Sequence, residues 1–181
     1  MIKTFDIDGV ALISNNVFKD DRGLFFESFN HEKFEKELNQ KVVFVQDNIS
    51  ISKKGVVRGL HFQKPPYAQG KLVQVLKGRV IDVAVDLRVG SKTYGKHVSV
   101  ELSDATNNMF WVPEGFAHGF AALENDTIFS YKCTNYYNGK SEGVLKWDDV
   151  ELDIDWKVKS TILSEKDQLS ENFSNFVSPF K

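Results

Sequence analysis

The sequence is poor in cysteine, with one Cys, two Met and four Pro among 181 residues. A single thiol cannot form an intrachain disulfide, so the chain is not a small secreted scaffold held by such crosslinks, and a reducing compartment suits it. The N-terminus alternates apolar and polar residues instead of forming the apolar block of a signal peptide, which predicts a cytoplasmic protein. No apolar run approaches the roughly 18 residues that span a bilayer, so no membrane role is expected.

The chain also lacks an excess of charge of either sign. Its 23 Lys and Arg residues oppose 25 Asp and Glu residues, for a net charge of -2. This balance, with dispersed lysines, argues against extended nucleic-acid binding. Binding of a small anionic ligand is compatible with this composition, because two or three cations gathered in a pocket barely alter the net charge.

Short runs of alternating apolar residues are abundant, and aromatic residues make up 13% of the chain. Such runs, broken by turn residues, predict an all-β barrel or jelly roll. No repeat or linker divides the chain, so residues 1–181 are expected to form one domain. The predicted strands are 24–29, 41–46, 48–52, 56–62, 71–76, 79–87, 97–102, 108–112, 119–123 and 127–132.

Local signals place one turn and two helices. The sequence KLVQVL-KG-RVIDVAVDL predicts a β-hairpin closed by Lys77 and Gly78. Asn30 can cap a helix over HEKFEKEL, which places Phe34 and Leu38 on one face, and a helical turn is expected from Ser164. Beyond residue 156 the pattern predicts short helices or coil over the barrel. The aromatic end, FSNFVSPFK, could dock on its own barrel or on a partner subunit.

Polar residues interrupt the strand pattern in the segment QDNISISKKGVVRGLHFQ. Strict alternation would place Arg58 and His61 on opposite faces, but Gly59 permits a bulge that turns both inward. By itself a histidine such as His61 is more often a hydrogen-bonded structural imidazole than a base. Arg58 is the lone cation in an apolar stretch, and a guanidinium group suits a diphosphate.

The segment WVPEGFAHGF has the Pro-x-Gly-x-x-His spacing of the second cupin motif. The first cupin motif ordinarily supplies a His-x-His pair and a carboxylate to a metal, whereas GLHFQ here holds one histidine. His61 and His118 fall short of the three ligands that zinc and iron sites need, so no metal is predicted.

Several blocks together resemble the dTDP-4-dehydrorhamnose 3,5-epimerase family over nearly the whole chain. In order, they are FKDDRGLFFESF, FVQDNISISKKGVVRGLHFQ, AQGKLVQVLKGRVIDVAVDLR, WVPEGFAHGF, YKCTNYY, SEGVLKWDD and LSEKD. The resemblance implies a dimeric, cupin-like jelly-roll barrel with a few short peripheral helices and no cofactor. It implies epimerisation at C3 and C5 of dTDP-4-keto-6-deoxy-D-glucose to dTDP-4-keto-L-rhamnose.

The resemblance also implies residue roles. His61 matches the general base, Asp167 its carboxylate partner and Tyr131 the general acid. Lys71 matches a residue of the sugar pocket, where an ammonium group would stabilise the enolate formed when a proton leaves the carbon next to a ketone. Positions matching substrate-binding residues are Arg22, Glu27, Gln46, Asn48, Arg58, His118, Glu142 and Lys166, and the ring of Tyr137 or Phe26 could stack on the base.

Plain structural roles compete with several of these assignments. Ser164 and Asp167 have the spacing of a capping box, and Asp21, Arg22 and Gly23 read as a solvated turn. Lys71 would ordinarily be an exposed edge lysine, and Tyr131 an ordinary strand aromatic.

The sequence leaves the roles of two sets of charged residues undecided. Asp82 and Asp86 share one face of a predicted strand with Arg88, where they could line a cavity or form a structural ion pair. Arg22 and Glu27 could reach the neighbouring subunit's pocket in a dimer.

The sequence pattern is also compatible with other functions on this fold or a related barrel. These are an epimerase acting on C3 or C5 alone, a 4-keto sugar ketoisomerase, a non-catalytic sugar-nucleotide-binding cupin and a metal-dependent cupin oxygenase. The intact RGLHFQ and LSEKD blocks argue against the ketoisomerase. The joint presence of His61, Asp167 and Tyr131 argues against the pure binder.

Overall fold

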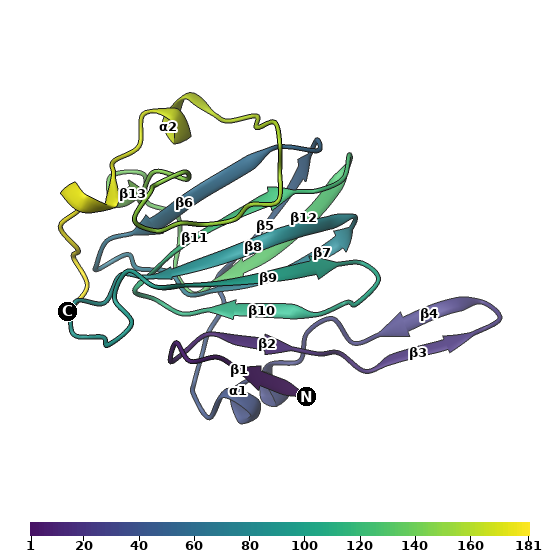
Figure 1. The fold of residues 1–181 in the computed structure, drawn as a ribbon. Coiled ribbons are helices and arrows are strands. Elements are labelled where there is room, and N and C mark those ends of the chain that lie inside the picture. Colours follow the sequence, from purple (N-terminus) through teal and green to yellow (C-terminus); the bar gives the residue numbers. More distant parts are fainter.

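The computed structural model describes residues 1–181 and consists of two packed antiparallel sheets with jelly-roll character (Figure 1). One sheet has the strand order β1-β2-β10-β7-β12-β5 and the other the order β13-β6-β11-β8-β9, while β3 and β4 form a separate hairpin. The strands are β1 Ile2–Thr4, β2 Ala11–Ile13, β3 Val17–Asp20, β4 Gly23–Phe26, β5 Gln46–Ser52, β6 Val57–Gln63, β7 Lys71–Lys77, β8 Arg79–Asp86, β9 His97–Ser103, β10 Met109–Val112, β11 Phe116–Ala122, β12 Thr127–Cys133 and β13 Glu142–Val144. The predicted all-β class with short peripheral helices is confirmed.

The main core lies between the two sheets. Alternate residues of strands in both sheets meet there, among them Val73 and Val75 of β7 and Phe120 of β11. Burying each such side chain contributes about 1.5–3 kcal/mol. The intervening residues face outward, so each sheet needs a cover on its other side. Helix α1 (His31–Leu38) places Phe34 against the outside of the six-stranded sheet, and the chain beyond β13 covers the five-stranded one (Figure 1).

The predicted hairpin around Gly78 is wrong. β7 pairs with β10 and β12, whereas β8 pairs with β9 and β11, so the chain passes at Gly78 from one sheet to the other. Gly78 has φ +83° and lies so close to Thr127 that a Cβ atom would be 2.6 Å from its hydroxyl oxygen. The glycine is therefore required by a tight corner, and tight corners occur between sheets as well as within hairpins.

Several strand boundaries also differ from the prediction. Residues 41–45 belong to neither sheet, because Val42 packs beside α1 and its amide donates to Glu35 Oε1 at 2.9 Å. β4 ends at Phe26, so residues 27–29 are not strand. The pattern missed β1, β2, β3 and β13, which are only three or four residues long and too short to show a period.

The helix predictions are confirmed. Asn30 caps α1 by accepting from the Lys33 amide, and Ser164 caps α2 (Glu165–Gln168). No helix is both long enough and apolar enough to cross a bilayer.

The C-terminal tail docks on its own barrel. A 3-10 turn spans Phe173–Asn175, and the ring centroids of Phe176 and Phe180 lie 5.4 and 5.9 Å from that of Phe62 on β6. Such edge-to-face aromatic pairs add about 0.5–1.5 kcal/mol each beyond the area that they bury. The tail is therefore part of the cover over the five-stranded sheet.

Asp86 resolves half of the question about the two aspartates, because it forms a structural ion pair. Its carboxylate accepts from the Arg88 guanidinium at 2.9 and 2.8 Å, from Ser91 at 2.6 Å and from Thr93 at 2.7 Å. Burial alone would raise the pKa of Asp86, but these hydrogen bonds outweigh it and hold the pKa at about 2. The resulting stabilisation is present above about pH 4 and is lost as the pH falls toward 2.

Candidate active site

A cleft of about 430 Å³ opens at one end of the space between the sheets. An adjoining pocket of about 90 Å³ shares His61, Lys71 and Tyr131 with it. The two hollows bring together most of the predicted site residues, namely Gln46, Asn48, Arg58, His61, Lys71, His118, Tyr131, Tyr137, Glu142, Lys166 and Asp167. The residues converge from strands of both sheets and from α2, so the site exists only in the folded barrel.

A bulge in β6 turns Arg58 and His61 toward the same cleft. Along β6 and β11 the register pairs His61 with His118 but Arg58 with Phe120, so β6 carries one extra residue. Gly59 occupies the bulge with φ +117°, where a Cβ atom would lie 2.6 Å from the Gly119 Cα. The predicted bulge is confirmed, and the glycine is required by its φ and by the close approach of β11.

His61 and Asp167 form a dyad at the rim. His61 Nε2 lies 2.6 Å from Asp167 Oδ1, and Ser164 donates to Oδ2 at 2.7 Å. Burial by itself would raise the pKa of Asp167, but the hydrogen bonds from His61 and Ser164 outweigh it and lower that pKa. An ionised Asp167 makes Nε2 the donor, so Nδ1 is the ring nitrogen left to take a proton. Asp167 is thus both the capping-box residue and the partner of His61.

Tyr131 approaches the cleft from the opposite sheet. It lies on β12, beside Phe129, with their ring centroids 6.1 Å apart. Burial raises the pKa of Tyr131, with smaller contributions from Cys133 and Glu142, so the phenol keeps its proton at neutral pH. A base and a protonated acid therefore face one space from two sides.

Lys71 lies on β7 and not at a sheet edge. Its strand is paired on both sides, with β10 and β12, and its side chain lines the cleft without making a salt bridge. Burial lowers the pKa of Lys71, while Cys133, Asp82 and Glu142 act in the opposite direction. An ammonium group with no protein counter-ion in a cleft is available to an oxygen atom of a ligand.

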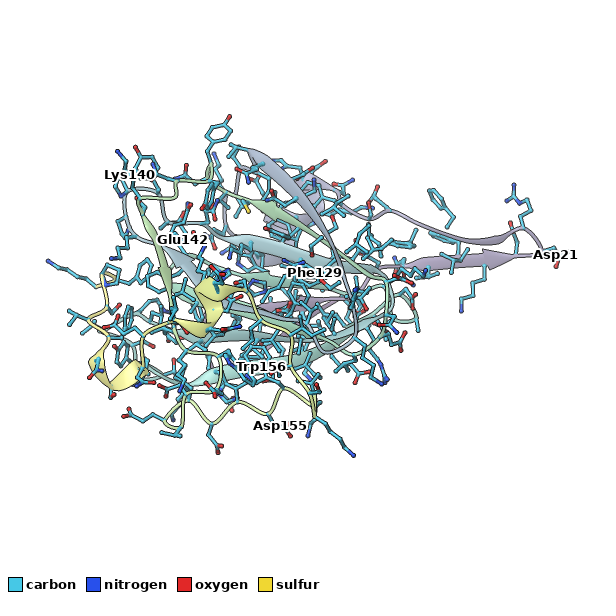
Figure 2. The ribbon with its side chains drawn as sticks, turned by 90° about the horizontal axis from the view of Figure 1, so that it is seen from above. Asp21, Phe129, Lys140, Glu142, Asp155 and Trp156 are labelled. Carbon is cyan, nitrogen blue, oxygen red and sulfur yellow. The ribbon has the colours of Figure 1, made fainter.

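The outer part of the site holds a second polar cluster. Glu142 on β13 accepts from the Tyr137 hydroxyl at 2.9 Å and pairs with the ammonium group of Lys166. Gln46 accepts from the Tyr137 amide at 2.9 Å. Figure 2 shows Glu142 beside α2, at the rim of the barrel.

The fold does not bring Arg22, Glu27 and Phe26 into this cleft. Arg22 sits in the turn of the β3–β4 hairpin, where its side chain is 90% exposed and pairs with Asp20. Glu27 pairs with Lys33 of α1 at 2.8 Å. Figure 2 shows Asp21, at the tip of the hairpin, far from Phe129 and Glu142.

Sequence reasoning missed Ser50, which lines the cleft from β5. Its hydroxyl oxygen is buried and has no hydrogen-bond partner. Gln46, Asn48 and Ser50 alternate along β5, and this period of two is the signal that could have found it. No three His, Cys, Asp or Glu side chains are grouped so that they could hold a metal ion.

Known proteins resemble the chain along its whole length. The family model described as dTDP-4-dehydrorhamnose 3,5-epimerase matches residues 4–175. The chain is 49% identical to the dTDP-4-dehydrorhamnose 3,5-epimerase of Shigella flexneri, over 96% of this chain and 95% of that protein.

Two solved structures share the fold. The dTDP-4-dehydrorhamnose 3,5-epimerase of Elizabethkingia anophelis superposes with a TM-score of 0.92 at 49% identity, covering 97% of each chain. An epimerase of Legionella pneumophila in complex with dTDP-4-keto-L-rhamnose gives a TM-score of 0.94 at 44% identity, covering 98% of this chain and 94% of that one.

Proposed function

The chain belongs to the dTDP-4-dehydrorhamnose 3,5-epimerase family, and on that premise we propose that its cleft converts dTDP-4-keto-6-deoxy-D-glucose to dTDP-4-keto-L-rhamnose. One observation carries the proposal. The His61–Asp167 dyad and the protonated Tyr131 face a common cleft from opposite sheets, and Lys71, on the strand next to that of Tyr131, lines the same cleft without a salt bridge. Epimerisation requires a base on one side of a carbon and an acid on the other.

The reaction runs through an enolate at each carbon. His61 Nδ1 removes the proton from the carbon next to the C4 ketone, and the electron pair of the C–H bond moves onto the carbonyl oxygen. Lys71 stabilises the negative oxygen, and Asp167 stabilises the imidazolium that forms. Tyr131 then donates a proton to the opposite side of the carbon while the enolate collapses to the ketone. Solvent then returns a proton to Tyr131 and takes one from His61, so no external oxidant or reductant is consumed.

The nucleotide binds toward the rim. Arg58 and Lys166 offer cations to the diphosphate, and the ring of Tyr137, which is 60% exposed, offers a face to the base. Lys166 is paired with Glu142 in the free protein. Binding of the diphosphate is therefore expected to compete with this pair for the ammonium group.

The test is proton NMR of dTDP-4-keto-6-deoxy-D-glucose in D₂O with the enzyme. We expect deuterium to enter C3 and C5 and the product signals to appear. Exchange at one carbon alone would replace the proposal with a mono-epimerase. No exchange at either carbon would overturn the catalytic proposal for this substrate.

We also propose that the protein is a homodimer, in which the β3–β4 hairpin reaches a partner. The hairpin projects from the sandwich (Figure 1) with Phe18 and Phe25 66% and 70% exposed. β5 is an edge strand that leaves Ile49 and Ile51 66% and 65% exposed. An open apolar edge and a protruding apolar hairpin are both liabilities in a monomer. In a dimer, the hairpin and the β5 edge would both be buried against the partner, and Arg22 and Glu27 would reach the partner's cleft.

Replacing Phe25 by aspartate is expected to dissociate the dimer, because a charge would have to be buried against the partner. Light scattering should show the monomer mass, and kcat/KM should fall roughly 10-fold or more, since a charge-assisted contact from Arg22 would be lost. Val150→Asp is the control, because Val150 is 90% exposed on the far cover and should stay dimeric. A fully active monomer would contradict the proposal.

A further inference from the structure

Asp82 is a buried carboxylate for which the reaction described above has no use. It lies on β8, is 0% exposed, and points into the space between the sheets, as do Val80 and Ala84. Both of its oxygens face one nitrogen, His118 Nε2, at 2.9 and 3.1 Å. This contact answers the other half of the aspartate question, because Asp82 contacts His118, which lines the cleft.

Comparison with Asp86 shows how unusual Asp82 is. The two residues lie on the same strand, on the same face, and both are 0% exposed. Asp86 accepts hydrogen bonds from Arg88, Ser91 and Thr93, whereas the side chain of Asp82 has the His118 ring as its only hydrogen-bond partner. A buried carboxylate that shares a single N–H group carries a large desolvation cost with little compensation. Stability alone therefore does not account for Asp82.

His118 is placed where its orientation matters. The register sets His118 of β11 directly opposite His61 of β6, so the two rings project from neighbouring strands toward the same cleft. Phe129 stacks on the His118 ring with an interplanar angle of 24°. Burial raises the pKa of Asp82, while the His118 contact and the charge of Lys71 act in the opposite direction. An ionised Asp82 can only accept, so in that form Nε2 of His118 carries a proton and Nδ1 is the ring nitrogen without a protein partner.

We propose that Asp82 is a positioning residue of the epimerase, because it fixes the ring and tautomer of His118 so that Nδ1 contacts the sugar beside the His61–Asp167 dyad. The site thus holds two histidine–carboxylate pairs. In one pair, His61 of β6 contacts Asp167 of α2 at the rim. In the other pair, both residues lie on neighbouring strands, β8 and β11, and the hydrogen bonds between these strands keep the pair rigid. This inference rests on the proposed function.

The test is Asp82→Asn, which keeps the shape of the side chain but lets its amide group donate as well as accept. We expect kcat to fall roughly 10- to 100-fold, the range usual for a residue that orients another functional group, with KM changed less than about 3-fold. The melting temperature should stay the same or rise, because a poorly compensated buried charge is removed. In a His118→Asn background the same change should cost less than about 2-fold, because Asp82 acts through His118.

Asp86→Asn is the matched control. It should lower the melting temperature by several degrees, because five hydrogen bonds, one of them from the Arg88 amide, lose their charged acceptor, and leave kcat of the folded enzyme unchanged. The proposal is overturned if Asp82→Asn keeps wild-type kcat, or if it costs as much with His118 replaced as with His118 present. If the wild type itself shows no exchange, the proposed function fails instead.

A spectroscopic measurement tests the proposal even if Asp82→Asn does not fold. The chain has only four histidines, so nitrogen NMR of protein labelled at the histidine rings is readily assigned with His118→Asn. Wild-type His118 should keep a protonated Nε2 over the neutral pH range. A ring that averages between the two tautomers, as free imidazole does, would overturn the inference.

Discussion

Replacing His61 by alanine is expected to lower kcat by roughly 10²- to 10⁴-fold, the usual contribution of a general base. KM should change only a few-fold, because the proton transfer contributes in the transition state and not to binding of the ground state. Deuterium exchange at C3 and at C5 should disappear together, since one imidazole with a single free nitrogen serves both carbons. Proton NMR in D₂O and steady-state kinetics measure these two effects.

The control for this prediction is His97→Ala. His97 begins β9, the edge strand of the five-stranded sheet, and lines neither hollow of the active site. Its removal should leave exchange at both carbons near the wild-type rate. Exchange that survives at one carbon in His61→Ala would show that a second group acts as base there, and His118 would then be the residue to replace next.

Replacing Lys71 by methionine is expected to lower kcat by roughly 10²- to 10³-fold, the usual effect of removing a donor to a developing oxyanion. The melting temperature, by contrast, should not fall. Lys71 makes no salt bridge, and burial lowers its pKa, so an apolar side chain of similar length is expected to leave the melting temperature unchanged or higher.

A lower kcat without a lower melting temperature distinguishes an electrostatic role of Lys71 from a structural one. Lys77→Met, on the exposed end of the same strand, should change neither kcat nor the melting temperature. A fall in the melting temperature with unchanged kcat in Lys71→Met would assign Lys71 to the fold and remove it from the mechanism. Partial recovery in Lys71→Arg would support a requirement for positive charge.

Much of the candidate site could be predicted because seven sequence blocks resemble the epimerase family, and parts of its geometry could be predicted because their signals are local. Gly59 between Arg58 and His61 marks a bulge whatever strand lies alongside, and the bulge is present. Ser164 and Asp167 are three residues apart, so the Ser164 hydroxyl accepts from the Asp167 amide within one turn and caps α2. Similarly, Asn30 and the spacing of Phe34 and Leu38 suffice for α1.

Other features could not be predicted, because one sequence pattern is compatible with two different structures. Asp82 and Asp86 have the same period on one strand, yet one contacts a histidine of the cleft and the other a structural arginine. A Lys-Gly corner between two apolar strands has the same composition in a hairpin as at a passage between sheets. The family resemblance makes Arg22 a substrate-binding residue, but in this chain it lies in a turn that is remote from the chain's own cleft.

The sequence by itself determined the β class and both helices with their caps, because these depend on neighbours within a few positions, and its resemblance to the epimerase family identified the residues that carry the chemistry. The tertiary structure decided which strands share a sheet, where the tail docks and which polar groups meet. Those choices join distant residues: His61 and Asp167 are 106 positions apart, and His118 and Asp82 are 36 apart. Alternation states only which face a side chain occupies, and any strand with the same period could lie opposite, so the partner is chosen only when the whole barrel packs.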